Sequence, residues 1–581
     1  MSLPSQRPTS NPLFVHRLAV LSLILIAFGF RIFFIERLPY DYDRSYSHGV
    51  GLTILYQLGH GLAPTALLHS ESSNSGLTNP TLTNYVFAAI GLFDHSPYTA
   101  TLITAALGAV VAAITYDLGK KYFGRRVGLI ALAVVATSPW SAFFARGSWY
   151  TGYFELSAAV PAWLLLKALL RKPTSTKAIA LGIISSAVVA HFYLVSFALV
   201  AQVAAVLFVA RTQLRHKTKL FALFVIAWLI SFVFVSVVIS ANRSSNIRPE
   251  GLSLVYGNPS AEEQAKLAAP GLNLVTLTRF GSLVGGRWEG WLEAMHTTTQ
   301  DTLNRLYRPG LSEGWLRAYR LRASAIEAAA MIGFVVWLIQ ARTRLIIRLM
   351  LVWLLIPLLG QIIVTSLLPT FPANHQNLFL ASPVSYLMVA CGFATVFGLA
   401  RKLIGSLSDV SIAAIRSMNA LKYVIRALGL FALAVIPIVS WMADADALQF
   451  PKPLPPADAM PMLWQLRLGE AVRNTCTTLN APENPFELSR LNMQYWAAGL
   501  MQDAGRVRAG ADIHTTNADA WQVSAQGGDC AIRASSETAP PFARAIEVTA
   551  PELVGRVQVY KALAPPVSVV GIQSEVRANI G

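Results

Sequence analysis

Residues 14–35 read FVHRLAVLSLILIAFGFRIFFI, and residues 39–48, which begin after three intervening residues, read PYDYDRSYSH. The first stretch is long and apolar enough to cross a bilayer as a helix, which takes about 20 such residues. The second stretch is polar and carries two carboxylates, Asp41 and Asp43. This junction predicts a membrane span that leads directly into an acidic loop at the membrane surface.

The composition of the whole chain is that of a membrane protein. Of its 581 residues, 54% are hydrophobic and only 13% are charged, and the mean hydropathy is +0.49. A soluble domain has about 25% charged residues and could not hide this much apolar surface, so a soluble enzyme and a disordered chain are both excluded.

Eleven apolar stretches are long enough to be transmembrane helices. They fall at residues 14–35, 98–119, 127–145, 150–169, 178–190, 192–210, 220–240, 325–341, 349–368, 378–400 and 424–442. Residues 178–210 could also form one long tilted helix. We prefer a hairpin that turns at His191 and Tyr193, because it keeps the charge pattern regular.

The basic residues determine the orientation. They cluster at Arg7 and Arg17, at 120–126, 171–177, 211–219, 342–348 and 401–426. With the N-terminus inside, every cluster falls on the cytoplasmic face, as the positive-inside rule requires. Residues 36–97, residues 241–324 and everything after 442 are then outside. The first 442 residues carry +20 of the net charge, spread over short loops, so nucleic acid is not an expected partner.

The C-terminal part differs from the rest. Residues 443–460 are a Pro-rich linker, and residues 461–581 have mixed polarity, which predicts a small extracytoplasmic α+β domain with β-rich stretches near 521–523, 545–548 and 556–560. Cys391 is expected in the apolar core. Cys476 and Cys530 could pair in an oxidising compartment, and pairing and non-pairing are equally compatible with the sequence.

Two polar features of the outside segments could carry chemistry. A carboxylate at Asp41 or Asp43, partly desolvated beside the bilayer, can have its pKa raised enough to act as a general base, although both could merely solvate the end of a helix. Arg146, which lies among aromatic residues, could bind a lipid phosphate or could be a snorkelling anchor. Glu155, close by, could line a cavity or pair with Arg146.

The order of these features resembles a known family. Asp43 leads an acidic motif in which Ser47 stands where a second acid often occurs, and an Asn79–Pro80 step precedes a short apolar stretch. A basic Phe-Gly-Arg turn follows at 120–126, and then Ser138, Pro139 and Arg146. The chain thereby resembles the GT-C glycosyltransferases, in the branch of protein mannosyltransferases and aminoarabinose transferases. The likeness covers residues 14–210 and extends loosely to about 400, where Gln376, Asn377 and Pro383 replace an Arg-or-His, Tyr and Pro pattern.

The resemblance implies an inverting transfer of a sugar from a polyprenyl-phosphate donor to an acceptor hydroxyl on the extracytoplasmic face. It makes Asp43 the general base, with Asp41 in reserve. Donor or acceptor binding is assigned to Arg146, Asn79, His48, Tyr46, His375 and Asn377. The acceptor could be a glycan, a lipid or a protein. A nucleotide-binding loop is not needed, and Gly281, Gly285 and Gly286 are interpreted as turns.

No cofactor is assigned. His48, His60, His69 and His95 share the first outside loop, but their spacings fit no compact metal-ligand set, so no metal site is predicted. Members of the superfamily differ in their use of a divalent metal ion, and the resemblance leaves that point open. The expected location is a bacterial plasma membrane, with the N-terminus cytoplasmic and lipid as a partner.

Two other functions compete with the enzyme. The first is a lipid-linked sugar flippase or secondary transporter, but transporters usually place ionisable residues and broken helices at mid-membrane, whereas the polar chemistry here gathers in outside loops. The second is an interaction protein whose C-terminal domain binds an envelope partner while the membrane part is inactive. Substitution of Asp43 discriminates, because it should abolish transfer only in the enzyme.

Overall fold

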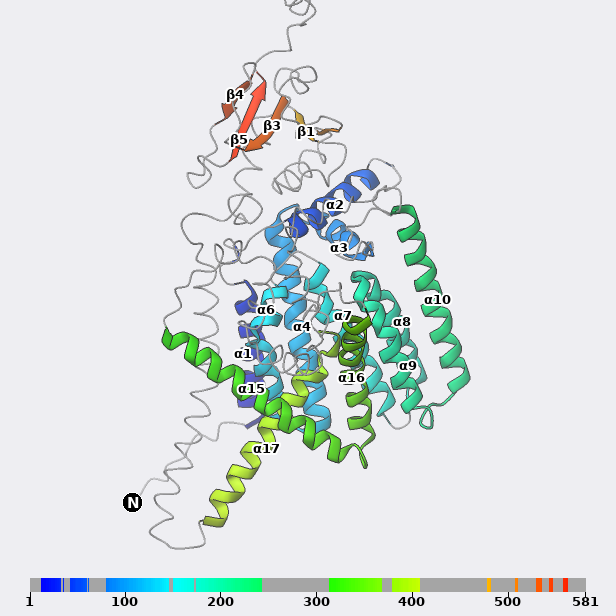
Figure 1. Cartoon of the computed structure of the whole chain (residues 1–581), viewed down its shortest axis with the longest axis vertical. Coiled ribbons are helices and arrows are strands. Elements are labelled where there is room, and N and C mark those ends of the chain that lie inside the picture. The colour runs from blue at the N-terminus through cyan, green and yellow to red at the C-terminus, as the bar shows by residue number, and fades with distance from the viewer. Residues whose placement is uncertain are drawn as a thin grey trace, which may run out of the picture.

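A computed structural model of the chain describes residues 12–32, 35, 42–59, 61, 80–145, 150–171, 174–242, 313–367 and 379–407, and five strands beyond residue 477. Most of the described part is a bundle of apolar helices (Figure 1). The α-helices are α1 (Pro12–Ile32), α2 (Tyr42–Gly59), α3 (Leu82–Gly91), α4 (Pro97–Phe123), α5 (Arg125–Ala136), α6 (Pro139–Ala145), α7 (Tyr150–Leu169), α8 (Thr176–Val189), α9 (Leu199–Val209), α10 (Lys217–Asn242), α15 (Glu313–Gln340), α16 (Leu345–Leu367) and α17 (Val384–Leu407).

The helices place the chain in a membrane. Within the described ranges, four are long and apolar enough to cross a bilayer, at Phe14–Ile32, Pro97–Phe123, Lys217–Val238 and Val384–Lys402, and several shorter apolar helices accompany them. The outer face of α10 exposes large aliphatic side chains such as Leu229, Ile230 and Val233, as a lipid-facing helix does. Each predicted span from 14–35 to 378–400 overlaps a helix, whereas 424–442 lies outside the described residues.

One predicted span differs from the structure, and one predicted turn agrees with it. The span predicted at 127–145 is divided, because α5 ends at Ala136 and α6 begins at Pro139. Ser138 caps α6 by accepting a hydrogen bond from the Ser141 N–H (3.3 Å), and proline suits the first helical position because it has no N–H to satisfy. The predicted hairpin at His191 and Tyr193 is confirmed. There α8 gives way to two 3₁₀ turns, η3 (Ala190–Phe192) and η4 (Leu194–Ala198), with Tyr193 extended between them.

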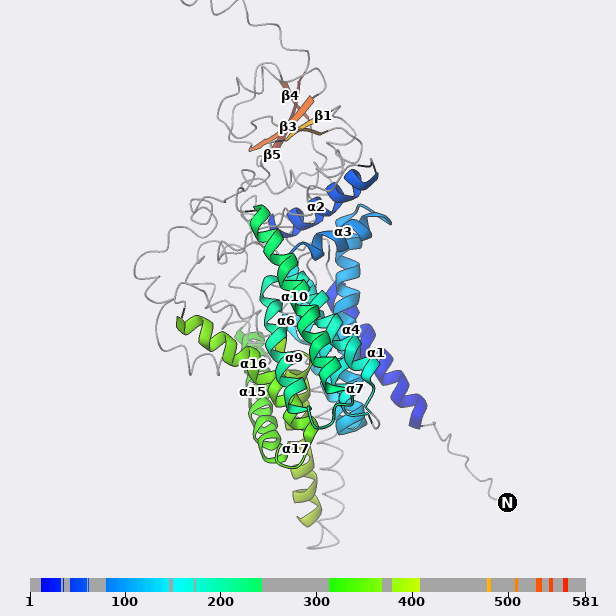
Figure 2. The ribbon, with the colours of Figure 1, turned by 90° about the vertical axis from the view of Figure 1, so that its right-hand side faces the viewer.

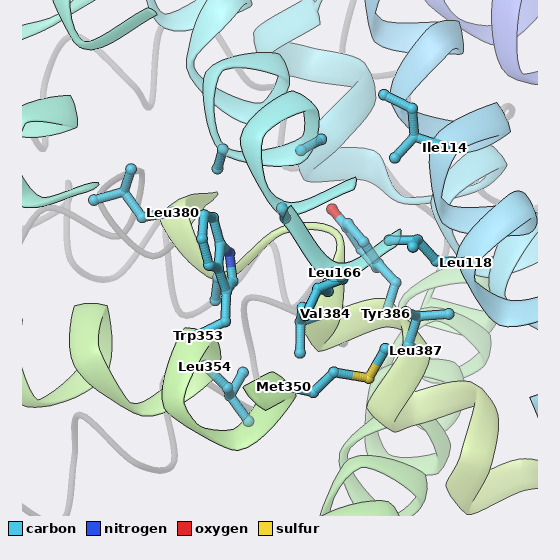
Figure 3. Packing of buried hydrophobic residues seen from close by; sticks show 14 of the residues in the cluster. Ile114, Leu118, Leu166, Met350, Trp353, Leu354, Leu380, Val384, Tyr386 and Leu387 are labelled. Atoms are coloured by element: carbon cyan, nitrogen blue, oxygen red, sulfur yellow. The ribbon is translucent and has the colours of Figure 1, made fainter. Parts of the chain in front are cut away.

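The core lies where α4, α7, α16 and α17 meet. Figure 3 shows Trp353 and Leu354 of α16 facing Leu380 and Val384 around the start of α17. Gln202 connects α9 to this part of the core, because its side-chain amide donates hydrogen bonds to the carbonyl oxygens of Trp353 (2.8 Å) and Leu380 (3.0 Å).

Helices α15 and α17 approach each other closely through glycines. A Cβ at Gly392 would lie 2.6 Å from the carbonyl carbon of Ala329, and one at Gly333 would lie 2.9 Å from that of Met388. Both distances are too short for a methyl group, so the small residues allow the two backbones to touch. This is the usual way in which helices pack inside a bilayer.

Beyond residue 477 the structure describes one mixed sheet in the order β2-β1-β3-β5-β4. Its strands are β1 (Thr478–Ala481), β2 (Val507–Ala509), β3 (Asp529–Ala534), β4 (Ala543–Ile546) and β5 (Val557–Ala562). Strand β1 is parallel to β2 and β3, and the other pairs are antiparallel. The predicted stretches at 545–548 and 556–560 overlap β4 and β5, but 521–523 lies outside the described residues. Figures 1 and 2 show the sheet on the side of the bundle where α2 and α3 lie.

The pairing of Cys476 with Cys530 stays open, as the sequence left it, and the domain boundaries stay predictions. Cys530 stands in β3 opposite Leu479, but Cys476 falls outside the described residues. Cys391 is a buried free cysteine in α17, as expected of a core residue.

Candidate active site

Helices α2 and α3 lie across one end of the bundle (Figures 1 and 2). They pack closely, since a Cβ at Gly51 of α2 would lie 2.6 Å from the Cβ of Phe87 in α3. The short apolar stretch predicted after Asn84 is this α3 helix. Asp43 and Tyr46 belong to the first turns of α2, with Asp43 as its second residue. The other predicted site residues lie outside the described residues: Asp41, Asn79, Arg146, His375 and Asn377.

His48 is buried and begins a ladder of aromatic rings. Its ring meets Phe87 of α3 edge-on at 5.9 Å, and Phe87 meets Tyr153 of α7 in the same way at 5.9 Å. Tyr153 then stacks on Phe192 of η3, with ring centroids 5.1 Å apart. We call His48, Phe87, Tyr153 and Phe192 the aromatic ladder, and it joins α2 and α3 to α7.

Burial also sets the charge of His48. Desolvation lowers the pKa of His48 to about 3, with a further lowering by His95 and an opposing effect of Asp94. The imidazole is therefore neutral at neutral pH and supplies no positive charge for a phosphate group. Its predicted contact with donor or acceptor would have to be made by a neutral ring, and it stays a prediction.

The turn between α3 and α4 carries an exposed carboxylate, Asp94. It accepts hydrogen bonds from the Thr99 hydroxyl (2.5 Å) and from the Ser96 N–H (3.1 Å). The bond from Thr99 is the largest effect on Asp94 and holds its pKa below the usual value. Ser96 in turn caps α4 by accepting from the Tyr98 N–H (3.2 Å). The side-chain bonds of Asp94 thus belong to the capping of α4.

A second polar cluster is buried inside the bundle. It contains Arg31, Ser138, Ser141, Glu155, Ser382 and Tyr386, which we call the polar node. Arg31 is 0% exposed, and its guanidinium donates to the carbonyl oxygen of Ala27 (2.8 Å) and to the Ser141 hydroxyl (2.6 Å). Ser141 donates onward to a carboxylate oxygen of Glu155 (2.5 Å). One hydroxyl thereby joins the two buried charged groups.

Glu155 also hydrogen-bonds two further residues of the polar node. Its other carboxylate oxygen accepts from the Ser382 hydroxyl (3.4 Å), and Tyr386 is a further hydrogen-bond partner. Tyr386 also bonds Ser138, and in Figure 3 its hydroxyl points away from the α17 ribbon. An arginine cannot lose its proton in a protein, so a buried guanidinium needs a negative partner. Glu155 is the acidic side chain of the polar node, linked to Arg31 through Ser141.

The residues of the polar node lie at those helix ends that, in the predicted topology, lead toward the outside segments. Arg31 is in the last turn of α1, Ser138 and Ser141 stand at the junction of α5 and α6, Glu155 is in the second turn of α7, and Ser382 and Tyr386 flank the start of α17. Ionisable residues inside a membrane domain are costly, and where they occur they usually serve function.

Comparisons with known proteins identify the fold. No protein-family model matches the chain, and a search of curated proteins finds no match. The crystal structure of ArnT from Cupriavidus metallidurans in the apo state matches with a TM-score of 0.50 and 11% identity, over 95% of this chain and 98% of ArnT. The chain has the fold of ArnT.

Two further structures are similar at lower scores. ArnT from the same organism bound to undecaprenyl phosphate has a TM-score of 0.49 and 12% identity over 95% of this chain and 98% of ArnT. The archaeal oligosaccharyltransferase AglB from Archaeoglobus fulgidus, in complex with an inhibitory peptide and a dolichol-phosphate, has a TM-score of 0.43 and 13% identity. That match covers 80% of this chain and 58% of AglB. The fold that the sequence resemblance implied is confirmed by the comparison with apo ArnT.

The sequence analysis missed most of the polar node. Glu155 was noted, and the structure gives it Ser141 and Ser382 as partners. Arg31, Ser141 and Tyr386 were not singled out. The available signal was Arg31, an arginine near the end of an otherwise apolar span, because such a residue usually pairs with an acidic residue elsewhere in the bundle. Among the described residues, no three His, Cys, Asp or Glu side chains gather as a metal site would need. Use of a divalent metal ion stays open.

Proposed function

We propose that this chain is an integral membrane glycosyltransferase that moves a sugar from a polyprenyl-phosphate donor to an acceptor hydroxyl on the extracytoplasmic face. The observation that carries the proposal is the fold shared with ArnT over nearly the whole of both chains. ArnT binds undecaprenyl phosphate, a polyprenyl phosphate. The acidic motif found in the sequence, which lies at the start of α2, supplies Asp43, a carboxylate suited to act as the general base.

Asp43 is the proposed general base, with Asp41 in reserve. As the second residue of α2, Asp43 stands in a first helical turn, where unpaired N–H groups and the helix dipole favour a negative charge. A charged carboxylate at this place is ready to accept a proton at neutral pH. We assign donor-phosphate binding to Arg146, because its planar fork can make paired charge-assisted hydrogen bonds to phosphate oxygens.

The reaction is a single displacement. The acceptor oxygen forms a bond to the anomeric carbon while the bond from that carbon to the phosphate oxygen breaks. The acceptor proton moves to the carboxylate of Asp43, and the electron pair of the broken bond leaves with the lipid phosphate. Attack from the face opposite the leaving group inverts the anomeric centre. General base catalysis of this kind contributes a factor of about 10² to 10⁴ in rate.

The test is single-turnover transfer by the full chain in nanodiscs. Radiolabelled polyprenyl-phosphate sugars are offered with envelope extract as acceptor, with and without a divalent-metal chelator. We expect Asp43→Asn to transfer at least roughly 100-fold more slowly than the wild type. Asp94→Asn is the matched control, because it makes the same change at an exposed carboxylate on the same side of the bundle, and it should transfer normally.

The outcomes separate the alternatives. Equal transfer by wild type and Asp43→Asn would move the base to Asp41 or elsewhere. A wild type that transfers no sugar from any donor would overturn the proposed function, and transport of a lipid-linked sugar would then be assayed instead. A slow variant is informative only if it retains the thermal midpoint and donor binding of the wild type, so both are measured alongside.

A further inference from the structure

Helix α7 presents two different side chains to two different neighbours near its start. Tyr153 and Glu155 are two residues apart, and two residues correspond to about 200° of rotation around a helix. Tyr153 therefore faces the aromatic ladder, where it meets Phe87 of α3 and Phe192 of η3. Glu155 faces the polar node, where it accepts from Ser141 and Ser382.

The polar node holds α7 from one side. Through Ser141, Glu155 is linked to the guanidinium of Arg31 in α1, and through Ser382 it is linked to the turn before α17. All of these groups are buried, so water does not replace a lost bond. The close fit leaves little freedom, since a Cβ at Gly108 of α4 would lie 2.8 Å from Nε of Arg31.

The aromatic ladder holds α2 from the other side of α7. His48 of α2 packs on Phe87, and Phe87 packs on Tyr153. Thr83 of α3 adds a hydrogen bond to the carbonyl oxygen of Phe192 (3.0 Å). His48 follows Asp43 by five residues in the same helix. A continuous path of packed and bonded groups thus leads from Glu155 to the helix that carries the proposed base.

We propose that Glu155 is a positioning residue for the transfer reaction: with Arg31 it fixes the start of α7, and through Tyr153 and the aromatic ladder it fixes α2 and hence Asp43. The inference rests on the proposed function. Glu155 itself is buried and acts through other residues. Misplacement of a reacting group by about 1 Å, even from a remote substitution, can slow a reaction roughly 100-fold.

The main variant is Glu155→Gln, which keeps the shape of the side chain and removes its charge. We expect kcat to fall roughly ten- to a hundredfold, with the KM for the lipid donor changed less than threefold. Glu155→Asp restores the carboxylate and should recover part of kcat. The control is Asp117→Asn in α4, which contacts the opposite end of α7. Asp117 accepts from Lys167 Nζ and Trp163 Nε1, both at 2.7 Å, so the control removes a carboxylate charge that is bound to α7 but lies away from α2, and it should keep kcat within about twofold.

A double variant separates positioning from plain stability. Arg31→Met with Glu155→Met removes both charges, and replacing a buried pair by apolar residues often restores stability. The polar ties to Ser141 and Ser382 would still be lost. A double variant with the wild-type thermal midpoint and a low kcat supports the inference. A double variant that regains full kcat overturns it, as does Glu155→Gln with normal kcat.

Hydrogen–deuterium exchange of the full chain in nanodiscs gives a readout that needs no activity. We expect faster exchange in α2 and α3 in the Glu155→Gln and double variants, and unchanged exchange there in Asp117→Asn. Equal exchange in all variants overturns the inference. If the wild type transfers no sugar, the proposed function fails, and the exchange result still decides whether Glu155 fixes α2. If Glu155→Gln does not fold, the double variant carries both measurements.

Discussion

Replacement of Gly392 by alanine should separate two helices that now touch. In the structure, a Cβ at this position would lie 2.6 Å from the carbonyl carbon of Ala329 and 3.0 Å from its Cα. Carbon atoms in contact are normally about 3.5–4.0 Å apart, so α15 and α17 would have to move apart by about 1 Å. The nearest obstacle is the carbonyl oxygen of Ala329, and all three atoms belong to the backbone, which cannot turn aside as a flexible side chain can.

The expected loss follows from two opposing terms. Overpacking of this kind costs about 1–3 kcal/mol, and a backbone obstacle puts Gly392→Ala at the upper end. Alanine is about 1 kcal/mol better than glycine inside a helix, which leaves a net loss of about 2 kcal/mol. The matched control is Gly398→Ala on the same helix, where a Cβ would meet nothing within 4 Å. This control should gain up to about 1 kcal/mol from the helix propensity alone.

The assay is thermal unfolding of the full chain in one detergent, with the three proteins measured side by side. At roughly 2 °C per kcal/mol, Gly392→Ala should unfold about 4 °C below the wild type and Gly398→Ala slightly above it. The order of the three midpoints matters more than their absolute values, because unfolding of a membrane protein can be irreversible. A midpoint for Gly392→Ala equal to or above that of Gly398→Ala would refute the close approach of α15 and α17.

Two further predictions concern other buried groups. The pKa of His48 is lowered to about 3, so below pH 6.5 this histidine is protonated in the unfolded chain but stays neutral in the folded chain, and the free energy of unfolding falls as the pH falls. Between pH 6.5 and 5 the wild type should lose about 2 kcal/mol more stability than His48→Leu. Parallel pH profiles of the thermal midpoint for the two proteins would contradict this. Gln202→Leu should cost about 1–3 kcal/mol, because it leaves the carbonyl oxygens of Trp353 and Leu380 without their donor, and an unchanged midpoint would show that these bonds contribute nothing.

The membrane-embedded helices could be predicted because the stability of each helix in a bilayer depends mainly on its own sequence. A helix in lipid satisfies its own backbone hydrogen bonds, so a long apolar run is sufficient evidence for it. The turn at His191 and Tyr193 was predicted instead from the regular pattern of basic loops, and it is confirmed. The break between Ala136 and Pro139 was missed, because the hydropathy of residues 127–145 is continuous and only Ser138 and Pro139 mark the capped start of α6.

The site could be predicted only in part. The sequence put Asp43 in a loop directly after the first span, whereas the structure makes it the second residue of helix α2, and its catalytic role stays a prediction. The short apolar stretch that the sequence predicted farther along is the α3 helix. The sequence offered no means of joining Arg31 to Ser141, which is 110 positions away, or Glu155 to Ser382, which is 227 positions away. Serine and tyrosine hydroxyls are common in membrane helices, and nothing local distinguishes those that bond a buried charge.

The sequence by itself determined that this protein lies in a membrane, where most of its helices run, and that an acidic segment follows the first of them. The tertiary structure alone decided that Arg31 and Glu155 share one buried polar node and that His48 packs against Phe87 in a buried place where desolvation lowers its pKa. The reason is that hydropathy adds up along a single segment. The charge and the hydrogen bonds of a buried group depend instead on which other segments surround it.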